Sequence, residues 1–304
     1  MANSWSIPTR LRSGAREVEV QQDEQADVLE ATARLGWDRL LGDGPVARRL
    51  STAVAWRVTR HWGGWSDHPI EWWHRLLASQ DFERPLHPRD AVRLTLREPG
   101  GATGLALTGP RTVAGDLVLR TTARLLGGEA ARGPWAVAAR LDLKLPTGRL
   151  ADAGGSGGLD AGLALSASAP LAGWLTAHAQ ATVARLSPLA SAEPLQPARW
   201  QLGGELGLAA TLPGGWVALL ESRALSTLFE RGWALAGQAP RQGDAVTAIT
   251  RPQNQLSVGL RRGPVTAWIS EDFTPGRRPE AGWPWFYDTN APDVAVGLSL
   301  VQPL

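Results

Sequence analysis

Apolar and polar residues alternate along many segments of this chain, each about ten residues long. The clearest segment runs from Leu29 to Asp38. One set contains Leu29, Ala31, Ala33, Leu35 and Trp37, and the other contains Glu30, Thr32, Arg34, Gly36 and Asp38. A helix would scatter both sets around its surface, whereas a β-strand separates them onto two faces. A length of about ten residues also matches the need of a tilted membrane-spanning strand.

The alternation recurs to the end of the chain. Further clear segments are 117–125, 135–145, 160–168, 177–183, 200–208, 256–261 and 294–300, and weaker ones are 17–21, 52–61, 91–97, 104–108, 215–224 and 265–272. The pattern predicts an all-β fold, an antiparallel up-and-down transmembrane β-barrel that forms one domain over residues 1–304. We expect about fourteen strands, with twelve as the alternative, because bacterial barrels of this kind have even strand numbers.

The connections alternate in length. Short turns lie at 98–101, 169–173, 212–215 and 262–264, and long connections lie at 63–89, 146–157, 188–198, 226–253 and 274–291. If the chain starts in the periplasm, every short turn is periplasmic and every long loop is extracellular, as in outer-membrane barrels. A soluble β-sandwich has no reason to keep this order.

Four tryptophans stand at strand ends beside short connections. Trp37, Trp135, Trp174 and Trp216 are therefore expected to form one aromatic girdle at a membrane interface. The alternative is that tryptophan simply packs at the ends of strands.

The composition favours a membrane barrel over a soluble sandwich. The chain has 304 residues, 43% of them hydrophobic, but only four Phe and one Met. Its apolar faces are mostly Ala and Leu, and a soluble core of this size needs more side-chain volume to reach native packing density. No apolar run is long enough for a transmembrane helix. The chain has no cysteine, which excludes disulfides, and its net charge of +2 without a basic cluster gives no sign of a nucleic-acid partner.

A bacterial outer membrane is the location that these features predict. Residues Met1 to Trp5 do not have the character of a secretory signal peptide. The prediction therefore requires that the signal has been removed from this chain or that the start codon lies further upstream. Otherwise the membrane interpretation is wrong.

Charged residues on the polar faces should line the lumen, because an Arg or Lys facing lipid near the midplane costs about 2–4 kcal/mol. The lumen-lining candidates are Glu30, Arg34, Asp38, Arg57, Arg93, Arg97, Arg120, Arg124, Arg140, Asp142, Lys144, Asp160, His178, Glu205 and Arg261. They indicate either a solvated path or a salt-bridge network that fills a closed interior. The mixture of both signs slightly favours the network, since a strongly selective pore would carry one sign.

The first long loop, 63–89, contains a short amphipathic segment. Ile70, Trp73, Leu76 and Leu77 would share one face of a helix. Their apolar surface predicts that the loop folds inward over the outer mouth of the barrel as a constriction. A loop that packs against its neighbours on the rim is the alternative.

Several short motifs, taken together in order and spacing, resemble an uncharacterised family of outer-membrane proteins known as domain of unknown function 3187. The matching residues are Gly63, Gly64, Asp67, Ile70, Trp73 and His74, then Arg84, Gly115 to Leu117, Lys144 to Gly148, Gly155 to Gly157, Asp160, Glu271, Asp272, and Ala291 to Asp293. The resemblance spans nearly the whole chain and implies an outer-membrane barrel. It implies no activity, and it adds Asp67 and Arg84 to Ile70, Trp73 and His74 as candidates for the loop constriction.

Two functions remain open. The first is a porin-like channel or transporter for small or hydrophobic solutes, and the second is a structural or partner-binding barrel with a plugged lumen. The expected partners are outer-membrane lipids, with a small solute or an envelope protein in addition. An enzyme is not expected: Ser166, His178 and Asp160 could be drawn as a hydrolase triad, but many serines and acids share that face. No cofactor or metal is predicted, because the histidines lack metal-ligand spacing.

Overall fold

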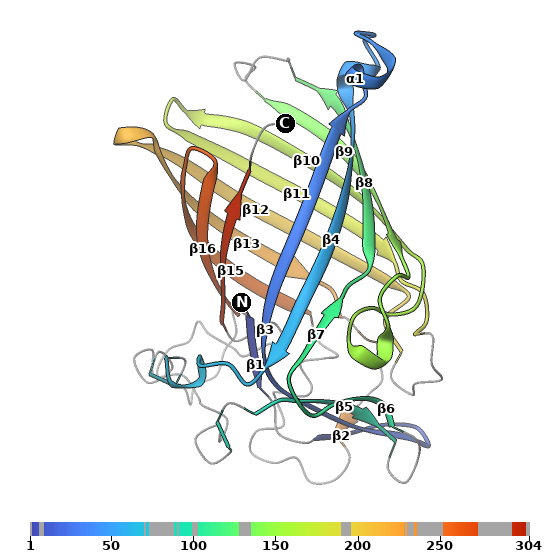
Figure 1. Ribbon diagram of the computed structural model, residues 1–304. Coiled ribbons are helices and arrows are strands. Elements are labelled where there is room, and N and C mark those ends of the chain that lie inside the picture. Colours follow the sequence, from blue (N-terminus) through green and yellow to red (C-terminus); the bar gives the residue numbers. More distant parts are fainter. Residues whose placement is uncertain are drawn as a thin grey trace.

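One antiparallel sheet of 17 strands makes up nearly all of the fold in the computed structural model. The structure describes residues 2–5, 9–69, 71–72, 88–89, 91–98, 103–127, 135–189, 196–227, 229, 234–235, 252–272 and 294–301. Figure 1 shows the sheet curving round a central space. No helix among the described residues is long and apolar enough to cross a membrane.

The wall consists of long strands that pair with their neighbours in chain order. They are β3 (Arg16–Gly36), β4 (Leu50–Trp62), β8 (Leu117–Leu126), β9 (Ala136–Leu145), β10 (Asp160–Ala172), β11 (Leu175–Arg185), β12 (Trp200–Leu212), β13 (Trp216–Leu225), β15 (Gln253–Arg262), β16 (Val265–Asp272) and β17 (Val294–Leu300). The short β7 (Arg111–Ala114) pairs with the lower half of β4, and β8 pairs with its upper half. We therefore count β7 and β8 as one position in the wall.

The strand β1 (Ala2–Trp5) joins the two ends of the wall. Ala2 is paired with Ala295 of β17 on one side and with Ala26 of β3 on the other. These pairings give the wall twelve positions, which is the alternative strand number that the sequence predicts. In the described residues β1 reaches only part of the way up, so β3 and β17 have no strand between them near the upper end and the barrel is not closed over its full height.

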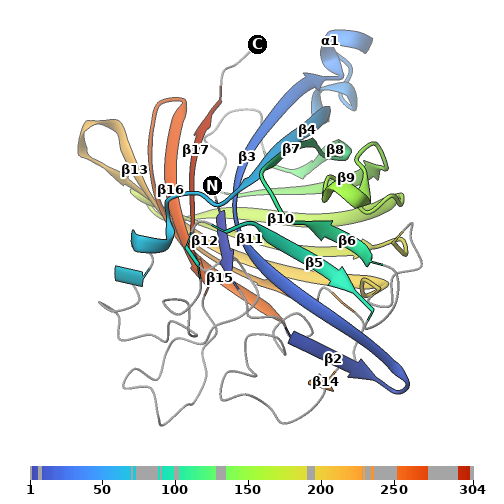
Figure 2. The ribbon, with the colours of Figure 1, turned by 60° about the horizontal axis from the view of Figure 1, so that its bottom comes forward.

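Three of the expected strands are arranged differently from the prediction of fourteen. Segment 17–21 is not separate but continues into 29–36 as the 21-residue strand β3. Segments 91–97 and 104–108 form β5 (Arg93–Arg97) and β6 (Thr103–Leu107), which lie below the wall; β5 pairs with the start of β3, and β6 pairs with β5. Figure 2 shows β2 (Thr9–Ser13), β5 and β6 at this lower end. The strands of the lower sheet alternate with the same period of two as the strands of the wall, because the two faces of the lower sheet also lie in different environments.

The lower sheet has a small apolar core of its own. Leu11, Val18 and Leu96 are buried there, with Leu105 and Phe229 packed against them. The two-residue β14 (Ala234–Leu235) pairs with β2 at its edge. This part of the fold therefore buries its leucines, in contrast to the wall above it.

The two ends of the wall differ in their connections. The upper end has the turns β10–β11, β12–β13 with the 3-10 turn η4 (Pro213–Gly215), and β15–β16, together with α1 (Asp38–Leu41) and η1 (Ala47–Arg49). Leu300, the last residue of β17, also lies there and is paired with Val265. The lower end has the connections that follow β4, β9, β11, β13 and β16, including η3 (Leu150–Asp152). The short turns 169–173, 212–215 and 262–264 thus lie together at the upper end, as the sequence predicts. The prediction was wrong for the turn 98–101, which joins β5 and β6 in the lower sheet, and the upper end also has the longer connection 37–49.

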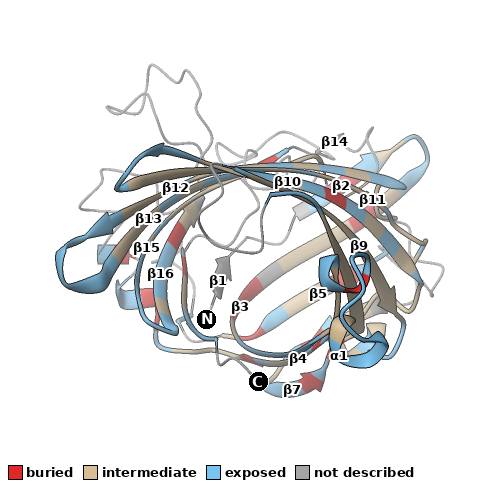
Figure 3. Ribbon diagram, turned by 90° about the horizontal axis from the view of Figure 1, so that it is seen from above, coloured by how far each residue is buried: buried red, intermediate tan, exposed pale blue. Residues whose placement is uncertain are grey.

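Leucines on the wall point outward rather than into a core. Leu29 is 72% exposed, Leu163 is 54% exposed and Leu206 is 68% exposed. Leu35 and Leu141 are exposed as well. In a two-sheet sandwich these side chains would be packed between the sheets. Figure 3, coloured by burial, shows exposed and intermediate residues along the wall, so the two-sheet sandwich is excluded.

Candidate functional site

The inner face of the wall carries most of the predicted lumen residues. Cross-strand pairs share a face, so the register places them opposite the exposed leucines. Those on the inner face are Glu30, Arg34, Arg57, Arg120, Arg124, Arg140, Asp142, Lys144, Asp160, His178, Glu205 and Arg261. The structure thus brings twelve of the fifteen candidates onto one surface.

Three candidates lie elsewhere. Asp38 is in α1, beyond the end of β3, because the chain leaves the strand at Trp37. Arg93 and Arg97 are on β5 in the lower sheet, where Arg97 forms an ion pair with Glu19. Alternation alone does not distinguish a strand of the wall from a strand below it.

Charges on β3, β4, β8 and β9 are largely paired. Glu30 accepts hydrogen bonds from Arg57 (3.0 Å) and Arg120 (3.1 Å) across three neighbouring strands. Arg140 donates to Asp142 at 3.0 Å. This part of the inner wall is therefore a salt-bridge network of the kind that the sequence suggests.

Lys144 lies at the lower end of this network and contacts three separate segments. Its Nζ donates to Asp116 Oδ2 (2.6 Å), Ser156 Oγ (2.7 Å) and the carbonyl oxygen of Gly158 (2.9 Å), and it lies 3.1 Å from Asp160 Oδ2. Asp116 also accepts a hydrogen bond from the backbone N–H of Gly148 at 2.8 Å. Three of the motifs that carry the family resemblance meet at this point.

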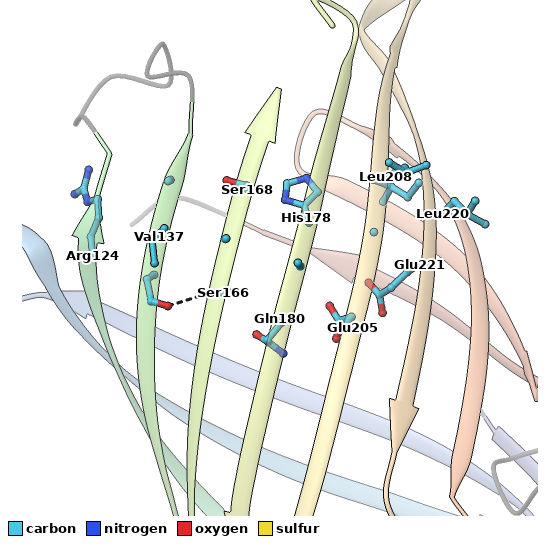
Figure 4. A pocket seen from close by; sticks show the side chains of 16 residues that line it. Arg124, Val137, Ser166, Ser168, His178, Gln180, Glu205, Leu208, Leu220 and Glu221 are labelled. Atoms are coloured by element: carbon cyan, nitrogen blue, oxygen red, sulfur yellow. Dashed lines mark hydrogen bonds between the residues drawn. The ribbon is translucent and has the colours of Figure 1, made fainter. Parts of the chain in front are cut away.

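A pocket with a volume of about 510 Å³ lies on the inner face of β10 to β13 and extends to β8 and β9; both polar and apolar side chains line it. Figure 4 shows His178 and Gln180 on β11, Glu205 on β12 and Glu221 on β13 along its wall. Gly207 is the direct cross-strand partner of both His178 and Glu221. Because Gly207 has no side chain, it leaves a hollow between them.

The pocket differs from the network in how its polar groups are satisfied. Within the described residues, the side chains of His178, Gln180 and Glu221 have no hydrogen bond or ion pair, and Glu205 has only Arg223 at 3.6 Å. Sequence reasoning missed Gln180, Glu221 and Arg223 as site residues. The sequence does carry a signal, since Glu221 and Arg223 alternate with Leu220 and Ser222, but the segment 215–224 predicts only a weak strand.

The structure does not bring Ser166, His178 and Asp160 together as a hydrolase triad. Asp160 lies six residues before Ser166 on β10, which is roughly 20 Å along a strand. Asp160 instead contacts Lys144, and its Oδ1 accepts the backbone N–H of Ser187. Ser166 Oγ donates to the carbonyl oxygen of Ala138 at 3.4 Å. No group of His, Asp and Glu suited to a metal ion occurs among the described residues.

The first long loop is described only in part. Ile70, Trp73, His74 and Arg84 lie outside the described residues. Asp67 is buried at the start of a helical turn. Just before it, Ser66 donates to Gln25 Oε1 at 2.9 Å. Gln25 is four residues before Leu29 on β3, so its side chain is on the same, outer face of the strand. The described start of the loop therefore packs on β3 from the outer side, in contrast to the predicted inward fold.

The four girdle tryptophans all lie at the upper, short-connection end. Trp37 follows β3, Trp135 precedes β9, Trp174 lies between β10 and β11, and Trp216 opens β13. Trp135 and Trp174 are exposed, and Arg262 lies over the Trp216 ring at 5.1 Å. Trp268 on β16 is a further tryptophan that the sequence analysis does not single out. It is two residues before Ser270, so it lies on the same inner face, and its ring covers Gly297 on β17.

Comparisons with known proteins bear on the fold. No protein-family model matches the chain, and no curated protein matches it. Among solved structures, an outer-membrane channel from Pseudomonas putida F1 matches with a TM-score of 0.50 at 13% identity, covering 98% of this chain and 90% of that one. BamA from Haemophilus ducreyi, lacking POTRA domains 1–3, matches with a TM-score of 0.32 at 10% identity, covering 95% of this chain and 60% of that one. The wall geometry and the first of these matches give this chain the fold of an outer-membrane β-barrel.

Proposed function

We propose that this protein is a channel of a bacterial outer membrane that passes small solutes through its barrel. The observation that carries the proposal is the separation of its two faces. Leu29, Leu206 and Leu298 are at least 68% exposed on the outer face, which suits contact with lipid. The inner face instead carries charges, Ser, Gly and Ala around a pocket with a mixed polar and apolar lining, which suits contact with water.

The grouping of three short turns at the upper end supports an orientation. Bacterial barrels have short periplasmic turns and longer extracellular loops. The upper end with α1 and the short turns would then face the periplasm, and the lower sheet of β2, β5 and β6 would face the outside. A solute would meet the lower sheet first and the pocket on β10 to β13 afterwards.

Reconstitution into planar bilayers tests the proposal. We expect discrete conductance steps, together with swelling of liposomes in small sugars. Arg34 is on the inner face and has no ion pair among the described residues. Arg34→Glu should therefore shift the reversal potential toward cation selectivity, while the outer-face control Leu35→Met should leave it unchanged. Absence of conductance and of swelling would refute the channel.

The second candidate is a closed barrel that binds an envelope protein. The observation in its favour is the network of Glu30 with Arg57 and Arg120, and of Arg140 with Asp142, which occupies one side of the interior. It predicts no flux and co-purification of a partner after cross-linking in the cell envelope. Conductance that responds to Arg34→Glu would count against it.

A further inference from the structure

The inner wall has two sectors that differ in the state of their hydrogen-bonding groups. In the sector of β3, β4, β8 and β9, each of the carboxylates Glu30 on β3, Asp142 on β9 and Asp116 just before β8 is bonded to an Arg or Lys. On β11 to β13, the side chains of His178, Gln180 and Glu221 have no such partner in the described part of the chain. His178 is exposed and Gln180 and Glu221 are half-buried, so a solute on the inner side of the wall can reach all three side chains.

The unsatisfied groups surround one point. Two rows of cross-strand partners run around the wall here. One row is Ser168, His178, Gly207, Glu221 and Ser257, and the next is Ser166, Gln180, Glu205, Arg223 and Gln255. Gly207 stands in the middle, and a Cβ built there would meet only ordinary contacts at 3.6 Å or more. The hollow is therefore real space, and a larger side chain could fill it without a clash.

The chemistry of the hollow selects the ligand. Glu221 supplies a carboxylate without an ion-pair partner among the described residues, and Glu205 has an Arg at 3.6 Å. Gln180 and the serines add acceptor oxygens next to the carboxylates. Around Gly207 acceptors dominate, and two carboxylates face one guanidinium, so the uncompensated charge there is negative. Arg124 lines the pocket at its β8 edge, where it donates to a backbone carbonyl oxygen. A group with several N–H donors and a positive charge complements this set.

We propose that the hollow at Gly207 is a binding site for a small solute that carries a primary ammonium group, with Glu221 as its anionic partner and with Gln180 and Glu205 as further acceptors. The site deepens the proposed channel function, on which it rests for the route by which a solute arrives. It would make the wall of β10 to β13 the preferred track for amines. The sector of β3, β4, β8 and β9, where the carboxylates are bonded to Arg or Lys, would bind such a solute weakly.

Binding in detergent solution tests the site without requiring a pore. The probe is 1,4-diaminobutane, measured by calorimetry and by native mass spectrometry on the purified full chain, with 1,4-butanediol as the uncharged probe of similar shape. We expect saturable binding of the diamine and none of the diol. Glu221→Gln should weaken diamine binding about tenfold, the loss of one charge-assisted hydrogen bond.

Two further variants separate the site from a general effect of charge. Gly207→Val fills the hollow but removes no polar group, so it should abolish binding while heat-modifiable mobility shows that the barrel is still folded. Glu30→Gln removes a carboxylate of the paired sector and should change binding by less than about twofold. Equal losses in Glu221→Gln and Glu30→Gln would overturn the site, as would binding that survives Gly207→Val.

The outcomes distinguish the site from the channel. Diamine binding with the expected variant pattern but without conductance in bilayers would refute the channel and support the site. Conductance without diamine binding, or with binding insensitive to Glu221→Gln, would support the channel and refute the site. If both hold, the diamine should also reduce the single-channel current, and Glu221→Gln should relieve that block.

Discussion

Lys144 connects segments that are distant in the sequence. It contacts Asp116 before β8, Ser156 and Gly158 in the β9–β10 connection, and Asp160 at the start of β10. Asp116 is 7% exposed and Asp160 is 14% exposed, so both carboxylates depend on this ammonium group for neutralisation. Removing one partner of such a group leaves the others as uncompensated charges.

Lys144→Met should therefore lower the free energy of unfolding by roughly 3 kcal/mol, the lower end of the range for breaking a buried ion pair. The measurement is urea unfolding of the barrel in lipid vesicles. Arg140→Met is the matched control, because Arg140 contacts only Asp142 among the described residues and is more exposed, so its loss should be smaller. A loss equal to that of the control would show that Lys144 does not hold the three segments together. Adding Asp116→Asn to Lys144→Met should recover part of the loss.

Glu19 makes the stability of the lower sheet depend on pH. Burial acts to raise the pKa of Glu19, but hydrogen bonds and charges of Arg97 and Arg10 outweigh it and hold this pKa below its ordinary value. The stabilisation is therefore fully present above about pH 4.3, the ordinary value for Glu, and is lost as the pH falls through the lower folded-state pKa.

Hydrogen exchange of the β2 and β5 amides should show this effect. In the unaltered protein their protection should fall as the pH drops below about 4. Glu19→Gln should have reduced protection already at neutral pH and a flatter dependence on pH. Glu17→Gln, which removes one contact with Arg12, is the control and should keep the dependence of the unaltered protein. The same acid dependence in Glu19→Gln would exclude Glu19 as its source.

At the scale of elements, the sequence predicts the position of nearly every strand but not which strands belong to the wall. The 21-residue β3 spans two surroundings. Its apolar residues have one parity in the lower sheet, at Val18 and Val20, and the opposite parity in the wall, at Leu29 and Ala31, and the polar run 21–25 separates the two parts. Periodicity records that one face is apolar and does not record whether lipid or a protein core covers it. The place of β5 and β6 depended on pairing with β3, which no local pattern encodes.

The seam beside β1 gives a test of the strand number. Ala2 pairs with both Ala26 and Ala295, so the latter two are separated by two strand spacings, or roughly 9.6 Å. Because the chain has no cysteine, engineered pairs are unambiguous. Ala2→Cys should form a disulfide with Ala26→Cys or with Ala295→Cys, while Ala26→Cys and Ala295→Cys should not react with each other. A disulfide between those two would mean that β3 and β17 pair directly and that the wall has eleven positions.

At the scale of the whole molecule, each strand of the wall carries apolar side chains on its outer face and polar side chains on its inner face. Leu206 and Glu205 are neighbours on β12, yet one is exposed on the outer face and the other lines the pocket. This separation follows directly from the alternation in the sequence. The unpaired state of Glu221 and Gln180 does not, because it depends on which side chains the register brings opposite to them.

A charge on the outer face should therefore be costly where the inner face tolerates it. Leu206→Arg should destabilise the barrel in vesicles by about 2–4 kcal/mol, the cost of Arg near the bilayer midplane. Ser168→Arg on the inner face is the control and should cost less than about 1 kcal/mol. The measurement is the folded fraction against urea concentration in vesicles, and equal costs for the two variants would contradict the assignment of the faces.

The position of Lys144 also makes the protein a reporter of its own folding. It is the chain's sole lysine, its side chain is 22% exposed, and its ammonium group contacts oxygen atoms from three segments. A lysine-specific protease could cut the chain only after residue 144, between the half that contains β1 to β9 and the half that contains β10 to β17. Resistance to that single cut would show an assembled barrel, and the appearance of two fragments would time its opening.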